Sequence, residues 1–451
     1  MPTNKKSALK KESLVKDIKK DIKEKVKEKK KRETFQSVKG IREILPEEEF
    51  WWDKFEKAVK KTAQFYNFRR IETGIVEQAG LFEKSLGDEV VNKEMFFLKS
   101  GGGKWVLRPE GTAPTARAYL QYGFSKLTQP VKLYYFGPMF RYENPQAGRY
   151  RQFYQAGFEI IGGENDAIFD AQTILGAWRF FEYVGLKDVE MKLNSIGCRS
   201  CRINITKRLV NYFKSKKKKL CKDCDRRLVE NPLRILDCKK EECKEVAEGA
   251  PIFLDGLCSQ CRIHFKNVLE YLEELKISYE IDNTLVRGLD YYNRTVFDFF
   301  YKGGEGKKLA IGGGGRYDYL MEMIGGRPTP ACGFSLGVER VIEALKDKKG
   351  DMGEKKRSSV FFIHVGEVAK KRGLCLIEEL RSAGIQVVES LSKSSLSKQL
   401  KLADKAKVEL ALIFGQKEVY EESVIIKNLK NGIQEVVPIS KMVNQVKKKI
   451  K

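Results

Sequence analysis

Hydrophobic and polar residues alternate along several short segments of the chain, as they do in strands that bury one face. Residues 131–136 and 153–161 are rich in the aromatic and β-branched side chains that strands favour. The sequence NPQAG at 144–148, between them, has the composition of a turn. This pattern predicts two strands joined by a loop.

Elsewhere, hydrophobic residues recur at the spacing of a helix that buries one face. Phe50, Phe55, Val59 and Ala63 form such a stripe and predict a helix over residues 46–66. The same analysis predicts a helix over 168–183, strands over 69–76, 189–195, 295–301 and 331–336, and a strand at 310–311 that enters the glycine run 312–315.

The C-terminal part of the chain alternates strand and helix patterns, which predicts a small α/β domain with a mainly parallel sheet. Its predicted elements are a strand at 359–365, a helix at 368–383, a strand at 386–389, a helix at 396–406 and a strand at 410–415.

One face of the predicted strand 153–161 carries polar groups. Side chains alternate along a strand, so Gln155, Gly157 and Glu159 share a face with Phe153 and Ile161. A glycine between a glutamine and a glutamate leaves a gap that suits a small ligand. The alternative is a solvated hairpin with ordinary surface arginines.

Charged residues at element ends are further candidates for a site. Arg141 and Glu143 share a face at the end of the first strand, and Arg340 lies in the first turn of a predicted helix, where anions are favoured. Glu110 and Thr112 follow a strand at a helix start, where a simple helix cap is the alternative.

The 451-residue chain has a formal net charge of +25, which favours a polyanionic partner such as a nucleic acid, although a lysine-rich composition alone also gives this balance. Only two histidines are present, which argues against a catalytic triad. Residues 1–33 hold 14 Lys or Arg against 6 Asp or Glu and are either a basic helix on RNA or a solvated tail. They have no apolar core of a secretory signal, so we expect a cytoplasmic protein.

Eight of the ten cysteines lie between Cys198 and Cys261. In a cytoplasmic chain such paired spacing indicates metal ligands rather than disulfides. Two pairs make one closed tetrahedral zinc site, so one or two structural sites are expected, with their pairing left open and reduced thiols as the alternative. The candidate ligands are Cys198, Cys201, Cys221, Cys224, Cys238, Cys243, Cys258 and Cys261.

Several strings together resemble the histidyl-tRNA synthetases, a family of class II aminoacyl-tRNA synthetases. They are GPMFRYENPQAGRYRQFYQAGFE (137–159), RGLDYYNRTVF (287–297), GGGGRYD (312–318) and the Gly-x-x-x-Gly-x-x-Arg that ends at Arg340. One departure is Gly74 after Thr73, where the family's dimer motif has proline.

The resemblance implies roles for particular residues. The implied catalytic residues are Arg141, Arg287 and Arg340. The implied ATP-binding residues are Arg141, Glu143 and Arg340. The implied histidine-binding residues are Glu110, Thr112, Gln155, Glu159, Arg287, Tyr291 and Tyr292.

The resemblance also implies an α+β fold with a class II catalytic domain, an antiparallel sheet flanked by helices. We expect a basic extension at 1–34, this catalytic domain at 35–345, an inserted Cys-rich domain at 196–275, a linker at 346–357 and an α/β anticodon-binding domain at 358–451.

The implied activity is histidine–tRNA ligase, with ATP, Mg²⁺, L-histidine and tRNA(His) as ligands and a homodimer as the assembly. The main alternative is a non-catalytic synthetase-like regulatory subunit of histidine biosynthesis. A metal-containing RNA-binding protein and a synthetase for another amino acid are further alternatives, which the combination of RGLDYY, Arg340 and the Gln155/Glu159 face opposes.

Overall fold

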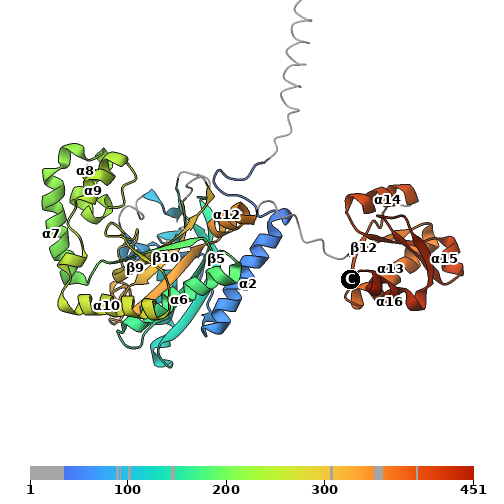
Figure 1. Ribbon diagram of the computed structural model, residues 1–451, viewed down its shortest axis with the longest axis horizontal. Coiled ribbons are helices and arrows are strands. Elements are labelled where there is room, and N and C mark those ends of the chain that lie inside the picture. Colours follow the sequence, from blue (N-terminus) through green and yellow to red (C-terminus); the bar gives the residue numbers. More distant parts are fainter. Residues whose placement is uncertain are drawn as a thin grey trace, which may run out of the picture. The chain divides into compact units, whose positions relative to one another are not determined.

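The computed structural model forms two compact units, one up to Lys349 and one from Gly350 onward (Figure 1). The basic extension and the predicted linker from residue 350 lie outside the described residues. So does the turn at 144–148, apart from Gly148. The structure describes residues 35–87, 91, 93–99, 103–143, 148–304, 308–349, 359–392 and 395–450.

The first unit is built on an eight-stranded sheet. Neighbouring strands are antiparallel, except that each edge strand pairs in parallel with its neighbour. The order across the sheet is β1 (Arg69–Arg70), β5 (Val131–Phe140), β6 (Gln152–Ile161), β11 (Ala331–Gly337), β10 (Lys308–Arg316), β9 (Asn293–Lys302), β7 (Val189–Ser195) and β8 (Glu280–Ile281).

Four helices line one face of this sheet and bury their apolar stripes against it (Figure 1). Phe55 of α2, on the predicted stripe, packs edge-on against Phe180 of α6 with ring centroids 5.0 Å apart. Phe158 and Phe334, from adjacent strands, stack at 4.8 Å beneath them. The helices are α2 (Glu49–Phe65), α6 (Ala167–Val184), α10 (Ser259–Glu274) and α12 (Val338–Lys349).

A second core lies on the other side of the sheet and continues into the inserted segment, so the insert is not a separately packed domain. Its smaller elements are the three-stranded sheet β2 (Val76–Gln78), β4 (Trp105–Leu107) and β3 (Phe96–Leu98), with α3 (Ala79–Ser85), α5 (Thr112–Gln121), η2 (Phe124–Lys126) and α11 (Leu320–Met323).

The insert is helical. Its last helix, α10, packs on α6 in the first core, whereas α7 (Arg199–Ser215), α8 (Lys222–Glu230), η4 (Pro232–Ile235) and α9 (Glu241–Glu248) join the second core. The short elements η3 (Lys217–Lys219) and η5 (Leu254–Gly256) complete the insert.

Several predicted boundaries differ from the structure; β5, for example, continues to Phe140, beyond the predicted 131–136. Of the strand predicted at 69–76, only Arg69–Arg70 form β1 and Val76 begins β2. Between them, the backbone carbonyl and hydroxyl of Thr73 accept hydrogen bonds from the buried Arg108 guanidinium at 2.8 and 3.0 Å. The helix α12 continues to Lys349, so it includes the first residues assigned to the linker at 346–357.

The second unit has a five-stranded sheet in the order β13-β12-β14-β15-β16. Its first three strands are parallel, and the last two add antiparallel pairings that the prediction of a mainly parallel sheet missed. The elements are β12 (Ser359–His364), α13 (Glu367–Ser382), β13 (Gln386–Glu389), α14 (Leu396–Lys405), β14 (Leu410–Phe414), α15 (Gln416–Tyr420), β15 (Ser423–Asn428), β16 (Gln434–Pro438) and α16 (Ile439–Lys449). Within the described residues, no helix is long and apolar enough to cross a membrane.

A buried ion cluster ties the helical layer to the sheet. Arg316, at the end of β10, is 1% exposed and donates to both carboxylate oxygens of Asp170 in α6 and, at 3.1 Å, to Asp318. His264 of α10 lies 3.3 Å from Asp170. These partners hold the pKa of the Asp170 carboxyl well below its usual value despite its burial.

Asp170→Asn should therefore destabilise the first unit by roughly 3 to 5 kcal/mol, because it leaves a buried cation short of its partner. All four tryptophans lie in this unit, so denaturant unfolding followed by tryptophan fluorescence measures the effect. The loss should be present at neutral pH. It should shrink only below the ordinary pKa of 3.8, because a depressed carboxyl pKa stabilises the fold above that value.

The matched control is Glu182→Gln, which breaks the exposed Arg179–Glu182 pair on the same helix and should cost less than about 1 kcal/mol. Equal losses for the two variants would contradict a structural role for the buried cluster.

Candidate active site

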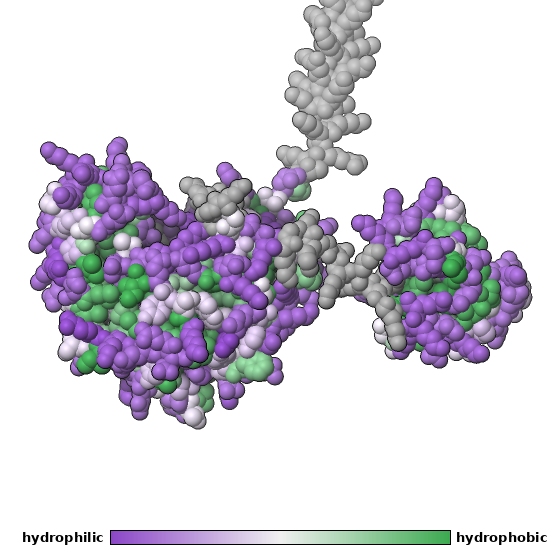
Figure 2. All heavy atoms as spheres, viewed as in Figure 1, coloured by the Kyte–Doolittle hydropathy of each residue, from purple (hydrophilic) through white to green (hydrophobic). Residues whose placement is uncertain are grey.

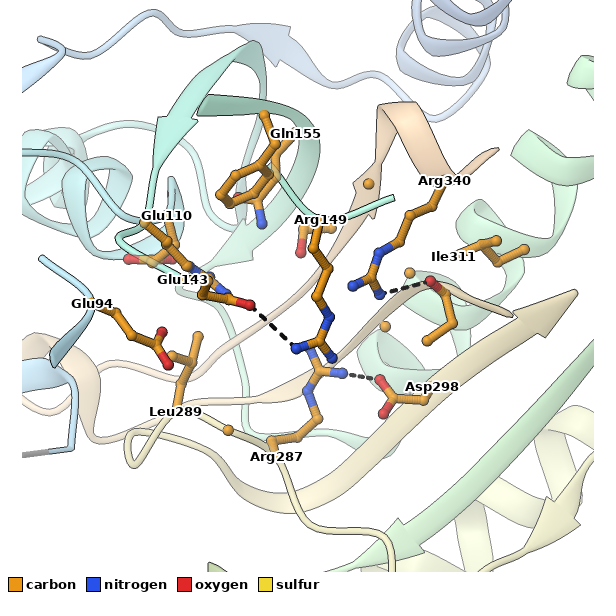
Figure 3. A pocket seen from close by; sticks show the side chains of 18 of the residues that line it. Glu94, Glu110, Glu143, Arg149, Gln155, Arg287, Leu289, Asp298, Ile311 and Arg340 are labelled. Atoms are coloured by element: carbon orange, nitrogen blue, oxygen red, sulfur yellow. Dashed lines mark hydrogen bonds and ion pairs between the residues drawn. The ribbon is translucent and has the colours of Figure 1, made fainter. Parts of the chain in front are cut away.

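A pocket of about 370 Å³ opens between the sheet, α12 and the loop 285–292 (Figure 3). The structure brings together in its wall every residue proposed from the sequence to bind histidine or ATP, except Glu159. Those in the wall are Glu110, Thr112, Arg141, Glu143, Gln155, Arg287, Tyr291, Tyr292 and Arg340.

Glu110 acts both as a helix cap and as a residue of the pocket, the two interpretations made from the sequence. Its two carboxylate oxygens accept the backbone N–H groups of Thr112 and Ala113 at 2.7 and 2.8 Å, so it caps helix α5. It also faces the pocket, where the hydroxyl of Tyr291 lies 3.4 Å away. Burial raises the pKa of Glu110, and the two backbone donors oppose that rise.

Glu159 lies one layer behind the wall. Its carboxylate accepts hydrogen bonds from the hydroxyls of Thr112 at 2.8 Å and Tyr317 at 2.5 Å, and it is 1% exposed. Burial raises the pKa of Glu159 to about 8. The carboxyl therefore reaches the pocket only through Thr112 or by a shift of its neighbours.

The gap expected over Gly157 is filled from within the protein. Tyr135 of β5 pairs directly with Gly157 of β6, and its ring occupies the space where a side chain at Gly157 would lie. The Tyr135 hydroxyl is buried without a hydrogen-bond partner, like Oε1 of Gln155. The sequence argument placed the gap correctly but assigned it to a ligand, because strand periodicity does not show what crosses from the neighbouring strand.

Two arginines reach the pocket from different elements. Arg141 donates to the carbonyl of Pro109 at 2.9 Å and lies over the Phe153 ring. Arg340 is held by the carbonyls of Gly148 at 3.2 Å and Ala310 at 3.0 Å (Figure 3). Burial lowers the pKa of Arg340; Arg149 and Arg141 add to that effect, and the carboxylates of Glu143 and Glu343 oppose it.

A third arginine lies flat on the pocket floor. Arg287 forms an ion pair with Asp298 of β9 (Figure 3), and its guanidinium lies 5.3 Å from the centre of the Tyr292 ring. Asp298 pairs directly with Gly313 of β10, and a side chain at Gly313 would overlap both charged groups. The glycine run is thus part of a strand rather than a loop after it, and it leaves room for this ion pair.

Sequence reasoning missed several wall residues. Asp298 lies within a predicted strand, where strand alternation was the available signal. Tyr317, which follows the glycine run and donates to Glu159 behind the wall, was also missed. Glu339 precedes Arg340 and accepts the backbone N–H of Tyr154 at 2.9 Å. Arg234 and Asp237 come from the insert, and no pattern in the sequence placed them at the pocket.

The eight clustered cysteines form two groups of four in the described chain. Within each group the sulfur atoms all lie within 4.8 Å of one another. The first and last pairs combine, as do the two middle pairs, which settles the partners that spacing left open. The groups are Cys198, Cys201, Cys258 and Cys261, and Cys221, Cys224, Cys238 and Cys243.

An antiparallel sheet backed by helices, with arginines from three separate segments converging on one pocket, is the catalytic architecture of a class II aminoacyl-tRNA synthetase. The family model described as histidyl-tRNA synthetase matches residues 40–341, and the model described as anticodon binding domain matches residues 359–449. The chain belongs to the histidyl-tRNA synthetase family. The resemblance and the fold class inferred from the sequence are confirmed.

Similar proteins support this membership. A histidine–tRNA ligase of Dehalococcoides mccartyi is 43% identical over 419 residues, 92% of this chain and 100% of the relative. That of Natranaerobius thermophilus is 41% identical over 413 residues, 91% and 98% of the two chains. The apo histidyl-tRNA synthetase structure of S. aureus matches 92% of this chain and 100% of its own at 30% identity, with a TM-score of 0.76.

Gly313→Ala should lower histidine-dependent ATP–pyrophosphate exchange by roughly 100-fold, because a methyl group there displaces Arg287 and Asp298 by about an ångström. The control is Gly80→Ala in helix α3, where an added methyl group meets nothing within 4 Å, so its exchange rate should match the wild type. An unchanged rate in Gly313→Ala would show that the ion pair does not position a reacting group.

Proposed function

We propose that the chain is a histidine–tRNA ligase that activates L-histidine with ATP to histidyl-adenylate and transfers the histidyl group to the 3′ end of tRNA(His). The observation that carries this proposal is the convergence of Arg141, Arg287 and Arg340 on one pocket backed by the Thr112–Glu159 hydrogen bond. Relatives about 40% identical over most of the chain carry the name histidine–tRNA ligase.

In the first step the histidine carboxylate attacks the ATP α-phosphate and pyrophosphate leaves. The carboxylate is already ionised, so the step requires alignment and charge stabilisation rather than a general base. We assign the α-phosphate to Arg141 and Arg287 and the γ-phosphate to Arg340, with Glu143 also on ATP. Mg²⁺ bound with ATP would neutralise phosphate charge.

The histidine pocket is assigned to the inner end of the cavity. Glu110, Thr112 and Gln155 would hold the α-amino group, and Tyr291 and Tyr292 would line the imidazole. Glu159 would accept an imidazole N–H, directly or through Thr112. A site that bonds a polar side chain discriminates strongly against analogues that lack it.

In the second step the tRNA 3′-terminal hydroxyl attacks the adenylate. Exposed lysines of the insert, including the run Lys217–Lys219, and the net charge of +25 suit an RNA partner. Hydrophilic residues predominate on the face of the insert that Figure 2 shows. We assign tRNA binding also to the anticodon-binding unit at 358–451 and propose a cytoplasmic homodimer.

The non-catalytic regulatory subunit is the less favoured function. The pocket retains all three arginines, and a model described as anticodon binding domain matches the C-terminal unit. We propose structural zinc in the cysteine groups, because four sulfurs at mutual distances within 4.8 Å suit a closed tetrahedral site.

Histidine-dependent ATP–pyrophosphate exchange should occur without tRNA, because all groups assigned to the first step lie in one pocket. The measurement tests each of the twenty amino acids separately with the full chain. Exchange with a different amino acid and none with histidine would overturn the assignment.

Two variants should separate histidine recognition from ATP binding. At about pH 8.5, where the Glu159 carboxylate is ionised, Glu159→Gln removes a charge-assisted hydrogen bond worth roughly 1.5 to 3 kcal/mol and should weaken histidine use by roughly 10- to 150-fold while sparing ATP. Arg340→Ala should do the reverse.

The pH dependence gives a second test of Glu159. Its pKa of about 8 means that the accepting carboxylate forms as the pH rises from 7 to 8.5, so the histidine KM of the wild type should fall over that range. The KM of Glu159→Gln should stay flat. A parallel fall in both would place the imidazole elsewhere in the pocket.

A further inference from the structure

The two cysteine groups share one local design. The second cysteine of every pair occupies the third position of a helix: Cys201 in α7, Cys224 in α8, Cys243 in α9 and Cys261 in α10. Two helix N-termini therefore converge on each group. Helix N-termini favour the thiolate form that binds metals.

Further contacts support metal binding over unrelated thiols. The backbone N–H groups of Cys258 and Cys221 point at the sulfurs of Cys201 and Cys243 at 3.2 and 3.3 Å. The sulfurs of Cys198 and Cys201 lie 3.6 Å apart, far beyond a disulfide bond but close to the separation expected around one tetrahedral ion.

The group formed by Cys221, Cys224, Cys238 and Cys243, here called the distal group, brackets a segment that reaches the active site. Between Cys224 and Cys238 the chain passes through residues 231–237, of which Arg234 and Asp237 line the substrate pocket.

This bracketed segment holds the loop that carries Arg287. The side chain of Arg234 donates to the carbonyl of Gly288, and the side-chain amide of Asn231 donates to the carboxylate of Asp290 at 3.2 Å. Leu233 packs in the same core as Val286. The loop 285–292 therefore lies between the sheet and the insert, with contacts from both.

We propose that each cysteine group binds one zinc ion, and that the distal ion is a positioning element for the active site. It holds residues 231–237 against the loop 285–292 and so keeps Arg287 on the pocket floor. The helices α8 and α9 are too short to be stable alone, and closing four thiolates around one ion fixes their relative arrangement. The positioning part of this inference rests on the proposed histidine activation, whereas metal binding and loop protection do not.

Metal content is the first measurement. Full-length protein prepared anaerobically with zinc should contain two ions per chain, and Cys243→Ser should contain one. Cys375→Ser is the control, since this exposed cysteine lies in the second unit outside both groups and its loss should leave both ions bound. Fewer than two ions in the wild type would overturn the two-site assignment.

Hydrogen exchange of the peptide that spans 285–292 is the second measurement, and it is independent of activity. Loss of the distal ion in Cys243→Ser should speed exchange in this loop by about 10-fold or more, while strands β5 and β6 stay protected. Uniform loss of protection would indicate general unfolding. An unchanged loop without the distal ion would overturn the positioning role.

Asn231→Ala tests the connection without touching a ligand cysteine or the pocket wall. It should keep both ions, yet speed loop exchange and lower histidine-dependent pyrophosphate exchange by roughly 5- to 30-fold, the range of one to two lost contacts. The control is Arg226→Ala in helix α8 of the insert, because the ion pairs of Arg226 stay within that helix. Wild-type behaviour of Asn231→Ala would overturn the proposed connection.

The outcomes separate this inference from the proposed function. If the wild type activates no histidine, the assigned reaction is wrong, but metal content and loop protection still test the metal sites and the coupling. If the wild type activates histidine and the zinc-depleted distal group leaves the rate and the loop unchanged, only the positioning role is wrong.

Discussion

The pocket depends on a floor of bare backbone at the centre of the sheet. Where β10 passes beneath the pocket, Gly313 leaves space that the ion pair of Arg287 and Asp298 occupies. Two strands away, in β6, Gly157 leaves space for the Tyr135 ring. Side chains can lie parallel to the sheet only where the strand below has none, so the glycines decide where charge can be placed.

A buried ion cluster at the end of β10 holds the strand that lies beneath these charged groups. Arg316 ends the same strand, β10, and its ion cluster with Asp170 and Asp318 connects that strand to α6. The strand is therefore fixed at its end by a buried cluster and open in the middle to the ligand. Several arginines face a common pocket because backbone carbonyls and the Asp298 carboxylate hold their guanidinium groups.

The features that could be predicted from the sequence are those that depend on local pattern. Strand periodicity placed β6 and its polar face, and the motif strings brought distant arginines to one fold. The ring of Tyr135 over Gly157, the recessed Glu159 and the partners of the cysteines depend on which strands and helices become neighbours. Such contacts are fixed only in three dimensions. No strand was predicted over residues 423–438, where the structure has β15 and β16.

The division into catalytic domain and insert, natural in the sequence, does not match the physical division of the site. Arg234 and Asp237 belong to the insert, yet they share a pocket with Arg287 and Arg340. The loop 285–292 follows the insert and the short strand β8, and it packs in a core to which the insert also contributes. A change that loosens the distal cysteine group therefore acts on the position of Arg287 without altering any residue assigned to the substrates. In this chain the insert is part of the active-site wall.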